Sequence, residues 1–352
     1  MNVITSSSSS SDDEEVVVVR RRKVYRNRVD CFNKYNESEF FERFRLTKET
    51  VRTLLDRVQH LIAPHTNRGG SIPAMIQLLL TLRFYATGSM LISAGDFVGV
   101  SKASACRVVK KVSTAICTLL PEYINMPRNN VEIGNITRKF YEIARFPRVI
   151  GAIDCTLIKI QSPGGNDAEI FRCRKGFFAL NVQTVSDPDL KIRNIVVRWP
   201  GSCHDQTIFN NSNLKQDFLA GRYGRYLLLG DSGYRTEPYL MTPLLNTQTA
   251  AENLYNESLI RSRNVVERQY GVWKRRFPIL SMGIRLHLET AMDVIVATAV
   301  LHNIAVEMNE NIPDDWVHNN NHGHDNDIIE HNENEGGHGA RRLLIAEHFA
   351  NL

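Results

Sequence analysis

Val149-Ile150-Gly151-Ala152-Ile153-Asp154-Cys155-Thr156 is the stretch of this sequence that decides the fold. Residues 149–154 and 157–160 are mostly apolar, which predicts one buried strand region. A carboxylate at the end of such a run is costly to bury unless a cation or hydrogen-bond donors compensate for it. Asp154 is therefore a candidate metal ligand, and a surface aspartate at a strand turn is the alternative.

The sequence downstream of this strand predicts a mixed set of strands and helices. Ser186-Asp187-Pro188-Asp189 is a turn sequence, so the strands on either side of it are expected to form an antiparallel hairpin. The order of elements fits an α/β sheet of the ribonuclease H kind, and it also fits other mixed sheets. In chain order the predicted elements are strands at 177–185 and 192–199, a helix at 202–219, a strand at 226–230, and helices at 252–277 and 288–308.

Two further acidic residues stand in contexts that suit the same site. Asp231 directly follows Leu227-Leu228-Leu229-Gly230, so the chain turns where this strand presents its last side chain; an ordinary turn is the alternative. Glu267 lies in a predicted helix on which Arg263 and Lys274 occupy neighbouring turns, and a solvated ion pair is its alternative.

Asp205 is a fourth candidate, and it ends the segment Trp199-Pro200-Gly201-Ser202-Cys203-His204-Asp205. Ser202 and Asp205 have the spacing of a capping box, in which Asp205 would only satisfy the first turn of a helix. Alternatively, the strand end brings Asp205 to the other carboxylates. Carboxylate oxygens are the usual protein ligands of Mg²⁺, and two such ions can stabilise the attacking and leaving oxygens of a phosphoryl transfer.

The N-terminal part of the chain is predicted to be helical from residue 38 to about residue 120. Within it, a short helix, a turn at Gly99, a cap at Ser101 and a basic second helix have the form of a helix-turn-helix. In that arrangement Lys102 and Arg107 would face DNA. A plain helical hairpin that supports the next domain is the alternative.

Charge favours a polyanionic partner. The whole chain has a formal net charge of +5, but residues 310–339 contain eight acidic residues and no Lys or Arg, so the remainder carries +13. A role of this charge in solubility alone is the alternative. Six scattered cysteines predict reduced thiols in an intracellular protein, and the apolar stretch at 294–306 is too short for a spanning helix and predicts a buried one.

Four motifs, taken together and in this order, resemble the PIF/Harbinger transposase family, which includes the Harbinger transposase-derived nucleases. The resemblance covers roughly residues 148–305, and the helical N-terminal part is similar to the helix-turn-helix segment of that family. The motifs are Gly151-Ala152-Ile153-Asp154-Cys155-Thr156, Trp199-Pro200-Gly201-Ser202-Cys203-His204-Asp205, Gly230-Asp231-Ser232-Gly233-Tyr234 and Arg263-Asn264-Val265-Val266-Glu267-Arg268-Gln269-Tyr270-Gly271-Val272-Trp273-Lys274.

The resemblance implies a ribonuclease H-like DDE domain and a metal-dependent DNA endonuclease. Asp154, Asp231 and Glu267 would be the catalytic residues, and together with Asp205 they would hold Mg²⁺ or Mn²⁺. Water, or later a 3′-hydroxyl in strand transfer, would attack a DNA phosphodiester. Three basic residues near the end of the same helix would hold the DNA backbone, with a solvated helix face as the alternative; these are Lys274, Arg275 and Arg276.

Composition and the resemblance together divide the chain into four predicted parts. We expect a disordered basic arm at 1–30, a helical, helix-turn-helix-like domain at 31–145, the nuclease domain at 146–309, and an acidic, Asn- and His-rich disordered tail with a short C-terminal helix at 310–352. A domesticated, catalytically silent DNA-binding or scaffold protein is the alternative to an active nuclease. DNA is the expected partner, a separate DNA-binding partner protein and an oligomer are both compatible with the resemblance, and no membrane is expected. The expected location is the nucleus, with the cytoplasm as a second compartment.

Overall fold

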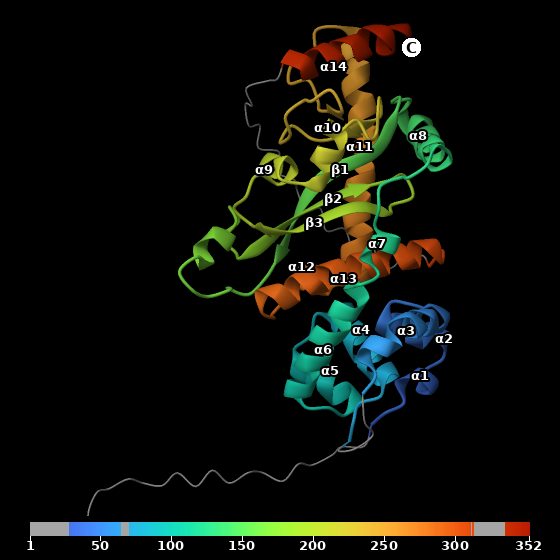
Figure 1. The fold of residues 1–352 in the computed structure, drawn as a ribbon, viewed down its shortest axis with the longest axis vertical. Helices are drawn as coiled ribbons and strands as arrows, with labels where there is room; N and C mark the ends of the chain where they lie inside the picture. The colour runs from blue at the N-terminus through green and yellow to red at the C-terminus, as the bar shows by residue number, and fades with distance from the viewer. Residues whose placement is uncertain (1–27, 65–69, 311, 313–334) are drawn as a thin grey trace, which may run out of the picture.

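The computed structural model of this protein describes residues 28–64, 70–310, 312 and 335–352. Figure 1 shows a helical part at one end of the molecule, a sheet in the middle and a C-terminal helix at the other end. Most of the predicted basic arm and the Asn- and His-rich tract at 313–334 lie outside the described residues. The boundaries predicted for the domains stay predictions.

The N-terminal half is helical, as its periodicity predicts. Thr47 caps its helix by accepting a hydrogen bond from the Thr50 backbone N–H. Gly88 ends another helix in the left-handed conformation, with a φ of 58° that glycine adopts without strain. The helices are α1 (Cys31–Lys34), α2 (Glu37–Phe44), α3 (Lys48–Ile62), α4 (Ala74–Thr87), α5 (Leu91–Val98), α6 (Lys102–Cys117), α7 (Leu120–Tyr123) and α8 (Asn130–Ala144).

The short helix, turn and basic helix expected near Gly99 are α5, a left-handed Gly99 and α6. Ser101 caps α6 by accepting a hydrogen bond from the backbone N–H of Ser104. Lys102 and Arg107 are exposed at the start of α6, whereas its later turns pack on α4 and α13 (Leu288–Glu307). Contact of Lys102 and Arg107 with DNA stays a prediction.

The sheet has five strands in the order β3-β2-β1-β4-β5, which confirms a mixed α/β class. The predicted hairpin is confirmed, because β2 pairs antiparallel with β3 on one side and with β1 on the other. The last two strands run parallel to β1, so β1 lies at the centre. The strands are β1 (Val149–Lys159), β2 (Ala179–Ser186), β3 (Ile192–Pro200), β4 (Leu227–Leu229) and β5 (Leu240–Met241), and a short 3-10 turn, η1 (Ala168–Phe171), precedes β2.

Gly151 is required where β1 passes β2. A Cβ atom at this position would lie 2.3 Å from Cγ1 of Val185, closer than any real side chain could sit. The same stretch contains the register shift between Val149 and Gly151 in the pairing of β1 with β4. Because β1 is continuous through residue 159, Asp154 lies in the middle of a strand and not at the end of one, as the sequence had suggested.

Two helices replace the single helix predicted at 202–219. They are α9 (Asp205–Asn210) and α10 (Asn213–Leu219), and the break falls at Ser212. The Ser212 side chain accepts a hydrogen bond from the backbone N–H of Lys215, so this residue starts a new helix. The prediction of one helix was therefore wrong, because a serine that can cap a helix also divides one.

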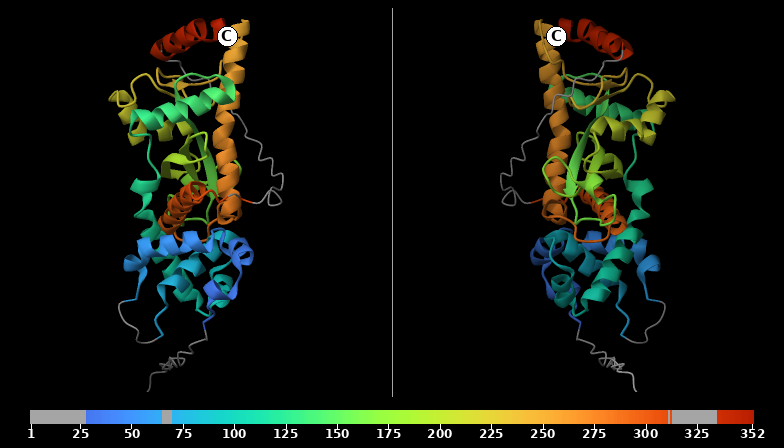
Figure 2. Two further views of the ribbon diagram at one scale, coloured as in Figure 1. Left: turned by 90° about the vertical axis from the view of Figure 1, so that its right-hand side faces the viewer. Right: turned by 90° about the vertical axis from the view of Figure 1, so that its left-hand side faces the viewer.

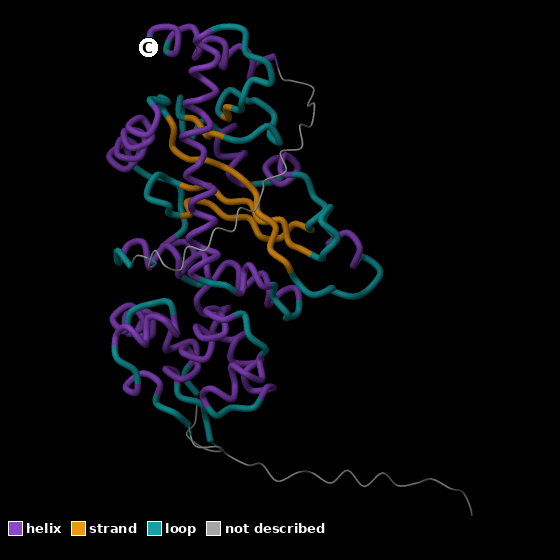
Figure 3. Tube along the Cα trace, turned by 180° about the vertical axis from the view of Figure 1, so that it is seen from behind, coloured by secondary structure: helices purple, strands orange, loops and turns teal. Residues whose placement is uncertain are grey.

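The long helix α11 (Ala250–Arg276) crosses one face of the sheet, as Figure 3 shows, and Figure 2 shows that it runs along most of the molecule. The short α12 (Ile279–Met282) follows it. Helix α13 lies between the helical part and the sheet, where it packs on α6 and β3. By length and composition α13 could cross a membrane, but 72% of its most apolar window is buried inside the molecule, which confirms the predicted buried helix.

The C-terminal helix α14 (Glu335–Glu347) returns to the sheet beside β5 and α11. Arg341 is 4% exposed and donates a hydrogen bond of 3.0 Å to Oγ1 of Thr236. Beyond α14 comes η3 (Phe349–Asn351), and the Phe349 ring packs against Phe146 and Tyr255 with centroid distances of 5.3 and 5.4 Å. The short C-terminal helix that the sequence predicts is thus present.

Glu310 joins the helical part to the sheet part after the end of α13. Its Oε1 accepts hydrogen bonds from the Thr47 backbone N–H, from the Thr47 hydroxyl and from the Thr50 hydroxyl. Arg276, the last residue of α11, donates to the carbonyl oxygens of Arg45 and Glu310. Both charged side chains are buried, so this junction is a polar contact enclosed by apolar packing.

Candidate metal centre

Strand pairing brings two of the predicted acidic residues together. In the parallel pair of β1 and β4, Ala152 lies opposite Leu229. Asp154 is two residues beyond Ala152, and Asp231 is two residues beyond Leu229, so the two aspartates extend from neighbouring strands at the same level. Side chains alternate along a strand, and both aspartates therefore share the sheet face of Ala152 and Leu229, which is the face that α11 covers.

Asp205 reaches the same point from the first turn of α9. One carboxylate oxygen from each of Asp154, Asp205 and Asp231 lies within 4.8 Å of the other two. Three carboxylates at this separation suit a divalent cation that prefers oxygen ligands, such as Mg²⁺ or Mn²⁺. The arrangement therefore fits the group that the sequence predicted, although the roles of these residues as ligands stay a prediction.

Asp154 is the most deeply buried member of the cluster, with 2% of its surface exposed. Its Oδ1 accepts a hydrogen bond of 2.8 Å from the backbone N–H of Cys155, and its main-chain carbonyl accepts one of 2.7 Å from the Tyr270 hydroxyl. Burial raises the pKa of Asp154, the neighbouring carboxylates of Asp231 and Asp205 raise it further, and the Arg263 guanidinium opposes the rise by stabilising the charged carboxylate. The environment is thus one that favours a compensating cation.

Asp205 is oriented by a side chain that the sequence analysis did not single out. Asn181 of β2 donates one hydrogen bond of 2.9 Å to Oδ1 of Asp205 and another of 2.8 Å to the carbonyl of Cys203. Burial raises the pKa of Asp205, and the bond from Asn181 opposes that rise. The sequence did contain one indication of a role for Asn181: it is a polar residue within a predicted strand. The structure shows that this strand is buried along its whole length.

The capping-box alternative for Asp205 is wrong. The residue that precedes the helix as its cap is His204, which makes no side-chain capping bond. The Ser202 hydroxyl donates to the carbonyl oxygen of Ile170 instead. Asp205 is consequently free of a capping role and directs its carboxylate towards Asp154 and Asp231.

Asp231 lies just past β4 in a tight turn. Its Oδ1 accepts a hydrogen bond of 3.0 Å from the backbone N–H of Gly233, which fixes the carboxylate at the strand end. The two interpretations of Asp231, a turn residue and a site residue, are therefore compatible, because the turn orients its side chain.

Glu267 is not part of the cluster of close carboxylate oxygens. Its side chain is 37% exposed, and its Oε1 accepts a hydrogen bond of 2.9 Å from Nη2 of Arg263, one turn earlier on α11. The other guanidinium nitrogen, Nη1 of Arg263, lies 3.3 Å from Oδ2 of Asp154. Arg263 thus links Glu267 to the cluster. The ion pair that the sequence analysis gave as the alternative for Glu267 is present.

The cations predicted to hold DNA lie in different surroundings. Lys274 is half-buried and donates a hydrogen bond of 2.6 Å to the hydroxyl of Thr156 on β1; burial lowers its pKa to about 8. Arg275 and Arg268 line a separate groove of about 1010 Å³ between α11, the β2–β3 turn and the end of α13. Lys274 is therefore close to the carboxylates, and Arg275 belongs to another surface. Arg276 is buried and donates to main-chain carbonyl oxygens, so it does not present its charge to a DNA backbone as predicted.

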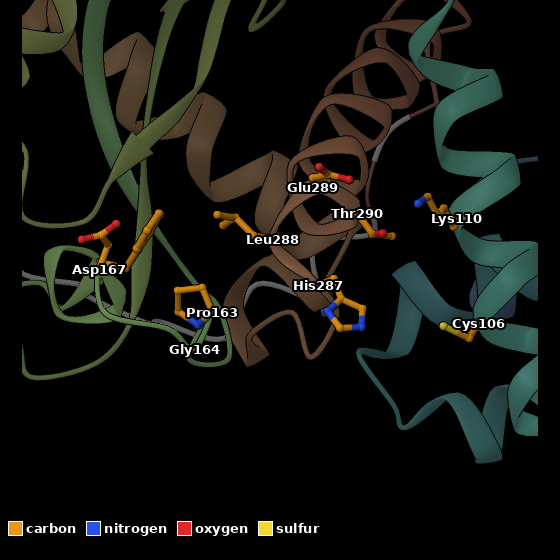
Figure 4. A pocket seen from close by; sticks show the side chains of 10 residues that line it. Cys106, Lys110, Pro163, Gly164, Asp167, His287, Leu288, Glu289 and Thr290 are labelled. Carbon is orange, nitrogen blue, oxygen red and sulfur yellow. The ribbon is translucent and has the colours of Figure 1, made fainter.

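A cavity of about 530 Å³ separates α6 from the sheet part. Figure 4 shows Lys110 and Cys106 of α6 on one side, the loop around Pro163 and Asp167 on the other, and the start of α13 at His287 between them. None of the four acidic residues lines it. This cavity is therefore distinct from the carboxylate cluster.

Comparison with known proteins agrees with this geometry. The family model described as DDE superfamily endonuclease matches residues 153–303, a stretch that contains all four acidic residues. The chain is 34% identical over 263 residues to HARBI1 of Bos taurus, a Harbinger transposase-derived nuclease, covering 74% of this chain and 75% of that protein.

Two further relatives extend the comparison. The chain is 34% identical over 245 residues to HARBI1 of Homo sapiens, covering 69% of this chain and 70% of that protein. It is 22% identical over 268 residues to Protein ALP1-like of Arabidopsis thaliana, covering 71% of this chain and 64% of that protein. No solved structure matches the chain.

Proposed function

Since this chain belongs to the family of Harbinger transposase-derived nucleases, we propose that it is a divalent-metal-dependent endonuclease that hydrolyses DNA phosphodiester bonds. The observation that carries the proposal is the approach of three aspartate carboxylates within 4.8 Å of one another from β1, α9 and the end of β4. The positive charge of the chain outside its acidic tail supports a polyanionic substrate.

The sheet supports a ribonuclease H-like nuclease domain as part of this proposal. A central strand carries the first aspartate, an antiparallel hairpin lies on one side of it, and parallel strands lie on the other. The second feature that supports the proposal is the covering helix α11, which carries Glu267. This topology allows acidic residues that are far apart in the sequence to meet over β1.

In the proposed reaction, Asp154, Asp205 and Asp231 hold the cation, and Glu267 completes the acidic set from α11. When bound, Mg²⁺ or Mn²⁺ supplies stabilisation of the negative charge that develops on the phosphodiester oxygens. The protein keeps the aspartates in place through neighbouring donors: Cys155 and Gly233 backbone N–H groups and the Asn181 amide. Preformed positions of this kind reduce the reorganisation that the reaction requires.

The cations of the chain would position DNA around this site. Lys274, bonded to Thr156 beside the cluster, would lie near the phosphate that reacts. The exposed Lys102 and Arg107 of α6 would contact DNA further away, and Arg275 would contact it from the groove that it lines with Arg268. A nuclear protein, with the cytoplasm as a second location, is consistent with this substrate. Strand transfer to a 3′-hydroxyl is a further activity for the same site.

Cleavage of duplex DNA by the purified full chain tests the proposal. We expect nicking that requires Mg²⁺ or Mn²⁺, and a loss of at least about a hundredfold in rate for Asp154→Asn and for Asp231→Asn. Asp56→Asn, an exposed aspartate on α3, should cleave at the wild-type rate. Cleavage that persists in both site variants would refute the site. Salt-sensitive DNA binding without cleavage would instead support the silent DNA-binding or scaffold protein.

A further inference from the structure

Arg263 is a buried cation placed directly against the carboxylate cluster. The residue is 7% exposed, and its guanidinium bridges two acids: Nη1 lies 3.3 Å from Oδ2 of Asp154, and Nη2 lies 2.9 Å from Oε1 of Glu267. Burial opposes its charge, yet Asp154, Asp231 and Glu267 together hold the pKa of Arg263 above its ordinary value. The guanidinium therefore carries a positive charge directly beside the carboxylate cluster.

The cluster needs such a charge when no metal ion is bound. Three carboxylates within 4.8 Å of one another repel, and Asp154 has little contact with water to screen that repulsion. Arg263 is the ion-pair partner of Asp154 within the described residues, whereas Lys274 donates to a neutral hydroxyl, that of Thr156. The unloaded site is thus neutralised in part by the protein itself.

A divalent cation at Asp154 would compete with this ion pair. The contact of Arg263 with Asp154 is the longer of its two, and the contact with Glu267 lies within one helix, where it can persist while the other opens. A planar guanidinium with two separate donor nitrogens suits this exchange better than a single ammonium group would. The two arrangements differ only by a shift of the guanidinium away from Asp154.

We propose that Arg263 is the resident counter-ion of Asp154 when no divalent cation is bound, and that binding of the cation displaces its guanidinium towards Glu267. This inference rests on the proposed function, because it takes the carboxylate cluster as the cation site. Arg263 is in this sense a positioning residue that sets the affinity of the site for metal and limits binding to ions of sufficient charge.

Metal binding by the full chain tests the inference without reference to cleavage. Mn²⁺ affinity would be measured by titration calorimetry for the wild type, Arg263→Gln and Arg263→Lys, with Asp154→Asn to identify the site. We expect Arg263→Gln to bind Mn²⁺ about tenfold more tightly than the wild type, because a competing positive charge has been removed. Arg263→Lys keeps that charge and should stay within about threefold of the wild type.

Thermal unfolding gives a second readout. In EDTA, Arg263→Gln should melt below the wild type, and Mn²⁺ should raise its melting temperature by more than it raises that of the wild type. Arg261→Gln, which removes an exposed arginine two residues away on the same helix, controls for net charge and should change neither quantity.

The outcomes separate this inference from the proposed function. Equal or weaker Mn²⁺ binding by Arg263→Gln, with wild-type binding that Asp154→Asn abolishes, would overturn the inference and leave the proposed function in place. A variant that stays unfolded in Mn²⁺ as well as in EDTA would also count against it. Wild-type binding that is absent, or unchanged by Asp154→Asn, would overturn both.

Discussion

His302 is a single residue whose protonation is linked to folding. It lies completely buried on α13, and its Nε2 is 2.8 Å from the carbonyl oxygen of Leu190 in the β2–β3 turn. A carbonyl only accepts, so Nε2 carries the proton, and Nδ1 has no hydrogen-bond partner among the described residues. Burial lowers the pKa of His302 to about 4 from an ordinary value of 6.5, because a charged ring has no water around it.

We therefore expect acid to destabilise the protein through His302. Its folded pKa is depressed, so the stabilisation is fully present above pH 6.5 and is lost as the pH falls towards 4, in total about 3 kcal/mol. Urea unfolding across this range should show a smaller loss of unfolding free energy for His302→Gln than for the wild type. His287→Gln, an exposed histidine just before α13, should keep the wild-type dependence. Equal dependence in all three proteins would contradict this assignment.

The residues of the site show what sequence can and cannot provide at this scale. Asp154, Asp205, Asp231 and Glu267 are recognisable because each stands in a motif, but their separations depend on how distant segments pair. Glu267 is linked to the cluster through Arg263, and this link depends on where α11 lies over the sheet, which the spacing of residues in the sequence does not determine. Asn181 was missed because its role depends on the pairing of β2 with β3, which places Asp205, beyond the end of β3, within hydrogen-bond distance of Asn181.

At the scale of single elements, helix α14 supports the loop between β4 and β5. Gly337 faces this loop so closely that a Cβ atom would lie 2.2 Å from the carbonyl oxygen of Thr236. Arg341, one turn further on, donates to the Thr236 hydroxyl, which is also bonded to the hydroxyl of Thr242. Asp231 lies at the start of the loop that α14 supports.

Two glycines of α14 provide a matched test of this contact. Gly337→Ala should lower the melting temperature and make the C-terminal segment easier to digest with protease, because the added methyl group displaces the helix from Thr236. Gly339→Ala makes the same change where nothing lies within 4 Å, and should stabilise the helix by up to about 1 kcal/mol. Similar effects of both substitutions would show that α14 does not depend on this close approach.

Regular elements follow from the sequence better than their ends and interruptions do. The helices α3, α11 and α13 were long enough to predict: α3 and α11 each bury one face over several turns, and α13 is a continuous apolar run that is buried on nearly all sides. The break at Ser212 was not predicted, since a serine within an apolar pattern is equally compatible with a continuous helix. Strand β5 has two residues, too few for any alternation to be recognised.

At the scale of the whole molecule, Glu310 and Arg276 connect the helical part to the sheet part. We expect Glu310→Ala to lower the free energy of unfolding by about 3 kcal/mol, because it removes the acceptor for Thr47 and Thr50 and takes from the buried Arg276 its acidic partner among the described residues. Urea denaturation measures this loss. Glu307→Ala, which removes an exposed pair with Lys191 from the same end of α13, should cost less than about 1 kcal/mol. Equal costs would show that the junction is no stronger than a surface ion pair.

This junction could not be foreseen from the sequence. Glu310 is the first of eight acidic residues in a segment without Lys or Arg, and nothing in the sequence distinguishes it from the other seven. Its burial depends on α3 and α11 both reaching the end of α13, which is a property of the assembled fold. The α/β class, by contrast, was predictable, since the change from helical to strand periodicity at residue 148 is local.

The return of the C-terminal segment has a consequence for the order in which the protein is made. Residues 335–352 leave the ribosome after every other described residue, yet they provide Arg341 to the Thr236 loop and Phe349 to the pair of Phe146 and Tyr255. A nascent chain can pair β1 with β2 and β3 early in translation, but it completes the support behind Asp231 only when this segment has emerged. Synthesis therefore separates the formation of the sheet from the final assembly of its acidic site.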